Sequence, residues 1–175
     1  TRVLTLGSAL MGAVIEGSHL DVGMKVITED EFAEARGNMR KICRGCHSEG
    51  FASRHLNDAD DIKRRADALV AEAVEIIRGL EKDGLLQPMP QDRPPHPQLG
   101  HQMVLGRDQL YSDTSVIEQE LFEMMKFDHA TTFKGAYHFS PDHTHALGWV
   151  RLQAALTRIR GEAARLRMQA ETPTQ

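Results

Sequence analysis

Cys43 and Cys46 are the two cysteines of this chain, and His47 follows the second of them directly. In the pattern C-x-x-C-H, the two thiols add to the two vinyl groups of a haem, and the imidazole that follows binds the iron as its proximal ligand. The residues between the cysteines are an arginine and a glycine, which suit a short exposed loop. The sequence therefore predicts one covalently attached haem c at Cys43, Cys46 and His47.

Other uses of two cysteines at this spacing were weighed against haem. A zinc site would need two more ligands, usually from a second pair of cysteines or histidines. A thioredoxin-like redox dithiol would lie beside a βαβ pattern, which this sequence does not show. A structural disulfide across so short a loop would stabilise the fold little. Haem c is the favoured interpretation, and a zinc site and a redox dithiol remain its alternatives.

The chain has nine histidines, more than one haem iron can use. Most of them are explained by exposure on the surface or by hydrogen bonds in the core. Four histidines gather around one glycine and one proline, and solvation alone explains such a group poorly. They are candidate axial ligands of haem iron: His129, His138, His143 and His145. If they bind haems other than the one at Cys43 and Cys46, those haems belong to missing sequence or to a partner chain.

Composition excludes several classes of protein. The net charge of −4 and the interleaving of basic with acidic residues argue against a protein that binds nucleic acid. The longest apolar stretch, residues 3–15, is interrupted by polar residues and is too short to cross a bilayer. With 175 residues, the chain has the size of one ordinary domain. Aromatic residues make up only 5% of it, which suits a core filled partly by a cofactor.

Helices are expected to position the cysteine motif. Thr28 and Glu31 form a capping box, and apolar residues then recur at helical spacing as far as Cys43. A second, longer helix is expected to begin at Asn57 or Asp58 and to end at a glycine cap, Gly84. Five prolines between Pro88 and Pro97 predict an extended arm.

Ser115 and Glu118 form another capping box, which predicts a short helix ending near Phe127. A loop carrying FDHATTFKGAYHFSPDHTH is expected next, and Pro141 suits the start of a long final helix. Its apolar stripe requires a partner helix, in this chain or in another subunit. The predicted fold is mainly α: one helical c-type cytochrome domain over residues 1–175, with haem-bearing helices at 27–84, a proline-rich arm at 85–113 and C-terminal helices at 114–175.

Three segments together carry a resemblance to a known family: ARGNMRKICRGCHSEGF, ADALVAEAVEIIRGL and FKGAYHFSPDHTHALGW. They resemble the C-terminal part of the octahaem hydroxylamine oxidoreductase family, which includes hydrazine-oxidising and nitrite-reducing members. The resemblance covers roughly residues 28–165. It implies closely packed c-type haems, mostly with two histidine ligands, and one haem with an open iron position that acts on small nitrogen compounds. It also implies trimers held partly through the C-terminal helices.

By this resemblance, Cys43, Cys46 and His47 form the last haem site of the family, and His138 and His145 match histidines of its downstream signature. The chain departs from the family in carrying a single C-x-x-C-H. The catalytic haem is therefore expected in missing sequence or in a partner chain.

Some oxidative members of the family have a tyrosine from the neighbouring subunit bonded to the catalytic haem. Tyr111 and Tyr137 are the two tyrosines of this chain and are the candidates for such a bond. Members that work reductively lack it, so the sequence does not assign the bond to either residue.

Three functions are considered. The first is a subunit or fragment of a hydroxylamine oxidoreductase-like multihaem oxidoreductase, which relays electrons to or from a catalytic haem acting on hydroxylamine, hydrazine or nitrite. The second is a free-standing monohaem electron-transfer cytochrome, and the third a haem-based sensor or assembly protein. The first explains the surplus of histidines. Because haem c is attached outside the cytoplasm, a periplasmic or other extracytoplasmic location is expected, as is an oligomer with other multihaem subunits.

Overall fold

The computed structural model describes residues 28–87 and 115–172, and within these residues all regular secondary structure is helical. This confirms the mainly α fold. The apolar stretch at 3–15, the proline arm and Tyr111 lie outside the described residues, so the predicted division at 85–113 stays a prediction. Among the described helices, none has the length and apolar character needed to cross a membrane.

Helix α2 (Glu29–Cys43) begins at the predicted capping box. The backbone N–H of Thr28 donates to Glu31 Oε2 at 2.8 Å, and the N–H of Glu31 donates back to Thr28 Oγ1 at 3.2 Å. Two of the N–H groups that the first turn leaves unpaired are satisfied in this way. The helix ends at Cys43, as predicted, and so places the cysteine motif at its C-terminus.

Helix α3 (Glu49–Lys82) is 34 residues long and begins earlier than predicted. Ser48, directly after the motif, caps it by accepting from the N–H of Phe51 at 3.3 Å. The predicted start at Asn57 or Asp58 is therefore wrong, because this serine supplies a cap and Ala52 and Leu56 extend the buried stripe toward the motif. The predicted end of this helix at a glycine cap is confirmed, because Gly84 has φ +69°, a backbone conformation that glycine adopts at little cost.

The second rod of the fold consists of α4 (Val116–Glu123), the π-helix η2 (Met124–His129) and α5 (Ala130–Tyr137). The capping box is confirmed, since the N–H of Ser115 donates to Glu118 Oε2 at 2.9 Å. The prediction that the helix ends near Phe127 is wrong. The predicted loop after it is also wrong for the residues up to Tyr137, which are helical. The backbone stays helical through both junctions, and the wider π turn accommodates the sequence there without breaking the rod.

A turn at Phe139 and Ser140 reverses the chain into the third rod: α6 (Pro141–Thr144), the π-helix η3 (His145–Trp149) and α7 (Val150–Glu171). Pro141 occupies the first turn of α6, as predicted. The turn is tight because two glycines allow backbones to meet. A Cβ on Gly135 would lie 2.6 Å from Thr144 N, and a Cβ on Gly148 would lie 2.6 Å from Thr132 Oγ1.

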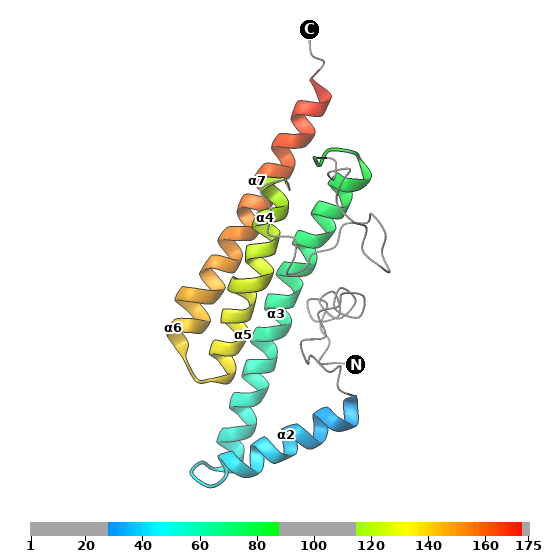
Figure 1. Ribbon diagram of the computed structural model, residues 1–175. Coiled ribbons are helices and arrows are strands. Elements are labelled where there is room, and N and C mark those ends of the chain that lie inside the picture. The colour runs from blue at the N-terminus through cyan, green and yellow to red at the C-terminus, as the bar shows by residue number, and fades with distance from the viewer. Residues whose placement is uncertain (1–27, 88–114, 173–175) are drawn as a thin grey trace.

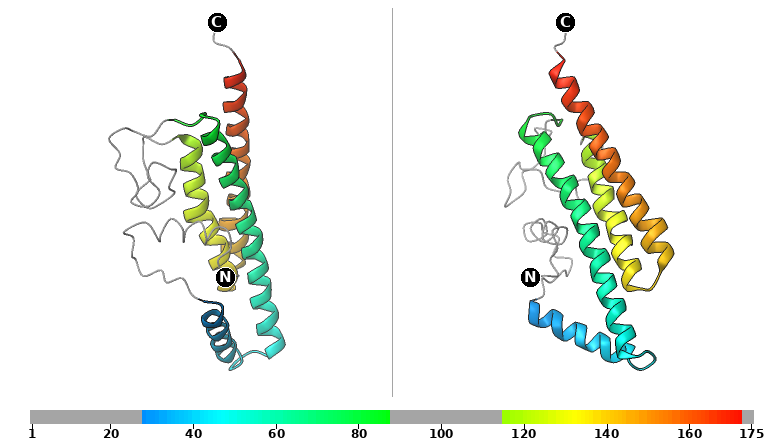
Figure 2. Two further views of the ribbon diagram at one scale, coloured as in Figure 1. Left: turned by 90° about the vertical axis from the view of Figure 1, so that its right-hand side faces the viewer. Right: turned by 180° about the vertical axis from the view of Figure 1, so that it is seen from behind.

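The three rods run side by side as a bundle, while α2 diverges from the lower end of α3 (Figure 1, Figure 2). The partner for the apolar face of α7 lies in the same chain, since this face is buried against α3 and α4. The core is aliphatic, and its largest fully buried side chains include Ile77, Leu80, Ile117, Leu121, Leu152, Leu156 and Ile159. The cysteine motif lies outside this core, at the corner between α2 and α3.

Candidate haem site

The cysteine motif forms a tight loop between α2 and α3. The N–H groups of Cys46 and His47 both donate to the carbonyl oxygen of Cys43, at 3.2 and 2.9 Å, and the N–H of Gly45 donates to Ile42 O at 3.1 Å. Cys43 is half-buried, Cys46 is exposed, and the two do not form a disulfide with each other. Because two long helices hold the ends of this loop, the thiols and the imidazole are presented together at one corner of the molecule.

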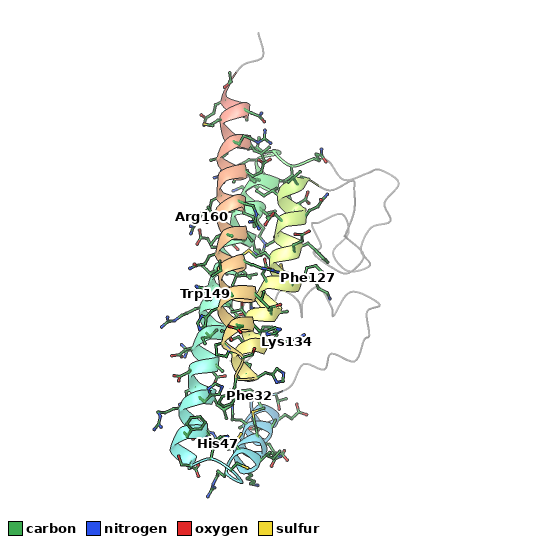
Figure 3. All side chains as sticks on the ribbon, turned by 90° about the vertical axis from the view of Figure 1, so that its left-hand side faces the viewer. Phe32, His47, Phe127, Lys134, Trp149 and Arg160 are labelled. Atoms are coloured by element: carbon green, nitrogen blue, oxygen red, sulfur yellow. The ribbon has the colours of Figure 1, made fainter. Side chains whose placement is uncertain are left out.

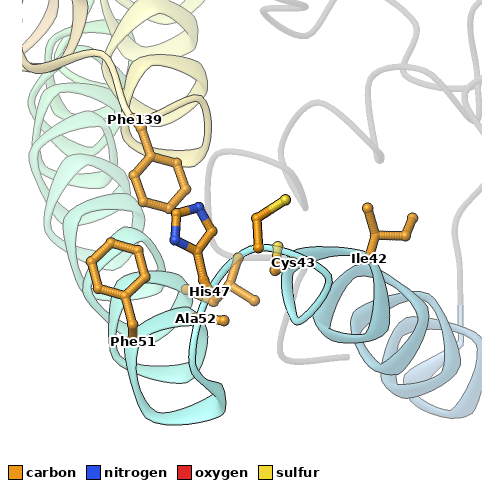
Figure 4. Close-up of a pocket in the computed structure, with 8 residues that line it drawn as sticks. Ile42, Cys43, His47, Phe51, Ala52 and Phe139 are labelled. Carbon is orange, nitrogen blue, oxygen red and sulfur yellow. The ribbon is translucent and has the colours of Figure 1, made fainter.

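A cavity of about 260 Å³ adjoins the loop. Figure 4 shows the rings of His47, Phe51 and Phe139 and the side chain of Cys43 around this cavity. The wall contains the three motif residues and otherwise only apolar side chains: Cys43, Cys46 and His47, with Ile42, Phe51, Ala52, Leu56 and Phe139. An apolar wall with two thiols and one imidazole is the donor set and the surface that a covalently bound haem requires.

Three large apolar side chains that line this cavity are exposed, as is Met39 one turn before Cys43 on α2. Ile42 is 79% exposed, Phe139 49%, Met39 45% and Phe51 41%. A cluster of large apolar residues on a protein surface usually marks a binding site. A flat, largely apolar macrocycle over the cavity would remove them from water, and so the residues present fit haem c.

Aromatic rings form a stack from the motif across to the α5–α6 turn. The His47 and Phe51 ring centroids are 4.8 Å apart, and those of Phe51 and Phe139 are 6.1 Å apart. The ring of His55 also stacks on that of Phe139. The Nε2 atom of His55 lies 3.1 Å from the carbonyl oxygen of Ala136, which accepts its hydrogen bond. Sequence reasoning did not single out His55; its spacing of four from Phe51 on α3 was the pattern that could have identified it.

His129 lies in the bundle interior and does not line the cavity. Its Nε2 donates to Asp67 Oδ1 at 2.6 Å, and Lys63 Nζ donates to the two oxygens of the same carboxylate at 3.1 and 2.9 Å. Asp67 and His129 are both buried. This group joins α3 to η2 through charge-assisted hydrogen bonds, and the structure gives it a part in the packing of the two rods.

The other three candidate histidines lie around the turn between α5 and η3, and all three are exposed. His138 follows α5 directly, His145 begins η3, and His143 Nδ1 is hydrogen-bonded to Ser140 Oγ at 2.9 Å. None of them lines the cavity next to the motif. The structure therefore brings Cys43, Cys46 and His47 together and leaves these histidines facing outward at the same end of the bundle.

A polar cluster joins α2, α3 and α5 near the cavity. Asp60 accepts hydrogen bonds from both Arg36 and Tyr137, and the Arg36 guanidinium lies over the rings of Phe32 and Tyr137, with Cζ 5.2 and 5.7 Å from their centroids. Burial, and then the hydrogen bond to Asp60, raises the pKa of Tyr137 to about 12. Figure 3 shows Phe32 and His47 at this end of the molecule, away from Arg160 on α7.

The two alternatives to haem find no support in the described residues. No group of three or more histidine, cysteine, aspartate or glutamate side chains that could hold a metal ion occurs in this part of the chain, although a zinc site would need one. The same residues contain no strand, so the βαβ surroundings of a thioredoxin-like dithiol are not present there.

No family model matches the sequence. A curated relative, a probable nitrite reductase-hydroxylamine oxidoreductase fusion protein of Kuenenia stuttgartiensis, is 29% identical over 169 residues, which cover 78% of this chain and 20% of the relative. A solved structure, the reducing HAO-like protein complex of the same organism, aligns with a TM-score of 0.68 and 25% identity over 86% of this chain and 37% of that one. The chain thus spans well under half the length of both, and the resemblance predicted from its motifs is confirmed.

Proposed function

Because this chain resembles hydroxylamine oxidoreductase-like proteins in sequence and in fold, we propose that it is a c-type cytochrome subunit or segment of such a multihaem oxidoreductase. Its task is to relay electrons between a catalytic haem outside the described chain and an external partner. The observation that carries the proposal is the C-x-x-C-H loop set against an apolar cavity with exposed aromatic walls.

Each residue of the site has a role in this proposal. Cys43 and Cys46 hold the group through thioether bonds, and His47 binds the iron from one side. When bound, the haem supplies an iron that takes up and gives back one electron. With a haem in place, Phe51, Phe139 and the aliphatic wall would shield its apolar surface from water, and such a shell tunes the potential of the iron.

The exposed histidines of the α5–η3 turn are assigned to haems of a partner chain or of further sequence. His138, His143 and His145 lie at the end of the bundle that also carries the C-x-x-C-H loop, and an imidazole exposed there can reach an iron that another polypeptide holds. The small coverage of both relatives supports this assignment, because most of a hydroxylamine oxidoreductase-like protein lies beyond these residues. His129 is the candidate that the geometry favours least, since its Nε2 is bonded to Asp67.

The substrate class follows the relatives and not this chain's own residues. Hydroxylamine, hydrazine or nitrite is proposed as the compound turned over at the catalytic haem. The location is proposed to be periplasmic or otherwise extracytoplasmic, because covalent haem of this kind is attached there.

The test is the covalent haem content of the native protein, with the intact mass of each chain that copurifies. One haem on this chain, together with further haem-bearing chains or domains, is the expected result, and turnover assays with the three nitrogen compounds follow from it. One low-spin haem on a chain that purifies alone would favour a free-standing electron carrier. A single five-coordinate haem would favour a sensor. Absence of covalent haem would overturn the proposal altogether.

A further inference from the structure

Two arginine nitrogens near the haem motif are buried without a hydrogen-bond partner among the described residues. They are Nη1 of Arg36 and Nε of Arg40, which lie one turn apart on the same face of α2. The Arg36 side chain is only 10% exposed. Buried guanidinium N–H groups are nearly always hydrogen-bonded in folded proteins, so two unpaired ones close together indicate a missing acceptor.

These arginines lie on α2 within two turns of Cys43, and they do not themselves line the cavity. On α3, Ala52 and Leu56 line the cavity, and Asp60, which accepts from Arg36, is the next residue on the same face. At a rise of about 1.5 Å per residue, Asp60 lies about 12 Å along α3 from Ala52. On α2, Arg40 precedes Cys43 by one turn, and Arg36 precedes it by two. The contact between Arg36 and Asp60 therefore links the arginine-bearing face of α2 to the face of α3 that lines the cavity.

The charges at this place do not balance. Arg36 and Arg40 each carry one positive charge, Asp60 carries one negative charge, and the phenol of Tyr137 is neutral at physiological pH. One positive charge is left over, in a partly buried position next to an apolar cavity. A single carboxylate would neutralise it and would accept hydrogen bonds from the two unpaired nitrogens.

We propose that Arg36 and Arg40 form a carboxylate-binding site, and that its ligand is a propionate of the haem attached at Cys43 and Cys46. This inference rests on the proposed function. In a haem, the propionates lie on the edge of the macrocycle opposite the vinyl groups, and the two arginines lie along α2 one and two turns before Cys43, where Asp60 of α3 meets Arg36. Asp60 accepts from Nη2 of Arg36 and so holds the guanidinium in place, while Nη1 is left to donate to the ligand.

The test compares Arg40→Gln with Lys41→Gln in the haem-loaded, full-length protein. Both changes remove one positive charge from α2, but Lys41 is exposed, whereas Arg40 carries an unpaired buried nitrogen. Arg40→Gln is expected to lower the haem reduction potential, because a nearby positive charge favours the reduced iron. It is also expected to move the pH-dependent step of that potential to higher pH, since the propionate loses the cation that keeps it ionised. The resonance Raman band of propionate bending should shift.

Lys41→Gln is expected to leave the pH step and the Raman band unchanged. Equal shifts of potential, pH step and Raman band in both variants, or no shift in Arg40→Gln, would overturn the carboxylate site. Covalent haem in both variants would leave the proposed function intact in that case. A lower potential with an unaltered propionate band would assign another carboxylate as the ligand and overturn the propionate. Arg36→Gln repeats the test, and if it fails to fold because Asp60 loses its partner, Arg40→Gln alone decides. Absence of covalent haem from the unmodified protein would instead refute the proposed function.

Discussion

Gly148→Ala is predicted to destabilise the fold, although alanine normally stabilises a helix. An added Cβ would lie 2.6 Å from Thr132 Oγ1, 2.7 Å from His143 O and 2.7 Å from Thr132 Cα. Two of these three atoms belong to the backbone, so the neighbours cannot relieve the contact by rotating a side chain. Relief requires η3 to move away from α5.

The magnitude follows from two opposing effects. Forcing extra atoms into a closely packed place costs about 1–3 kcal/mol, and three contacts this short put Gly148→Ala at the upper end of that range. The better helix propensity of alanine returns about 1 kcal/mol. The net loss of unfolding free energy is therefore about 2 kcal/mol, which corresponds to a melting temperature about 4–8 °C lower for a chain of this size.

Gly161→Ala is the matched control. Gly161 lies inside α7, and an added Cβ there meets nothing within 4 Å. The substitution is expected to raise the unfolding free energy by up to about 1 kcal/mol through helix propensity alone. Thermal and urea unfolding followed by circular dichroism measure both variants. If Gly148→Ala melts at or above the temperature of the unmodified protein, the close approach of η3 to α5 does not exist as described.

Three further predictions concern the site and the bundle. Cys43→Ser or Cys46→Ser should remove one thioether each and the double variant all covalent haem, measured as intact mass under denaturing conditions; haem that stays covalently bound to the double variant would contradict the assignment. Asp67→Ala should remove the acceptor of buried His129 and the ion pair with Lys63, and should cost about 3–5 kcal/mol in urea unfolding; a loss below about 1 kcal/mol, the size typical of exposed pairs, would show that the group is not buried. Folding raises the pKa of Tyr137 from 10.0 to about 12, so the protonated phenol stabilises the fold fully below the pKa of the unfolded chain. The free energy of unfolding should therefore fall as pH rises from 10.0 to about 12. Tyr137→Phe should lack that fall, and an ultraviolet phenolate titration in which both tyrosines ionise near 10.0 would contradict it.

Local chemistry made much of the helix pattern predictable. The capping boxes at Thr28 and Ser115 and the left-handed glycine at Gly84 depend on residues within a few positions of each other, and the structure has all three. The start of α3 was predicted wrongly because Ser48, Asn57 and Asp58 are all residue types that cap helices, and residue type alone does not distinguish them. Asn57 and Asp58, which also cap helices, instead lie exposed within α3.

The segment from Phe127 to Tyr137 was misjudged because its glycine and polar residues favour a loop when taken alone. In the folded chain, burial of His129, Thr132 and Ala136 against the other rods keeps this segment helical. Gly135 weakens a helix locally, but here it allows α5 and α6 to meet. Packing of this kind depends on residues distant in sequence, which periodicity within one segment does not contain.

The sequence by itself determined the chemistry of the site, since C-x-x-C-H places two thiols and an imidazole within one loop whatever surrounds it. It also determined the helical class, through caps and apolar spacing. Only the tertiary structure decided which histidine is buried beside Asp67 and which remain exposed, and that α7 finds its partner helix within this chain. It alone brought Arg36 of α2 to Asp60 of α3 and Tyr137 of α5. The physical reason is that covalent spacing fixes contacts within a turn or a loop, whereas contacts between distant segments follow from how the helices bury their apolar faces together.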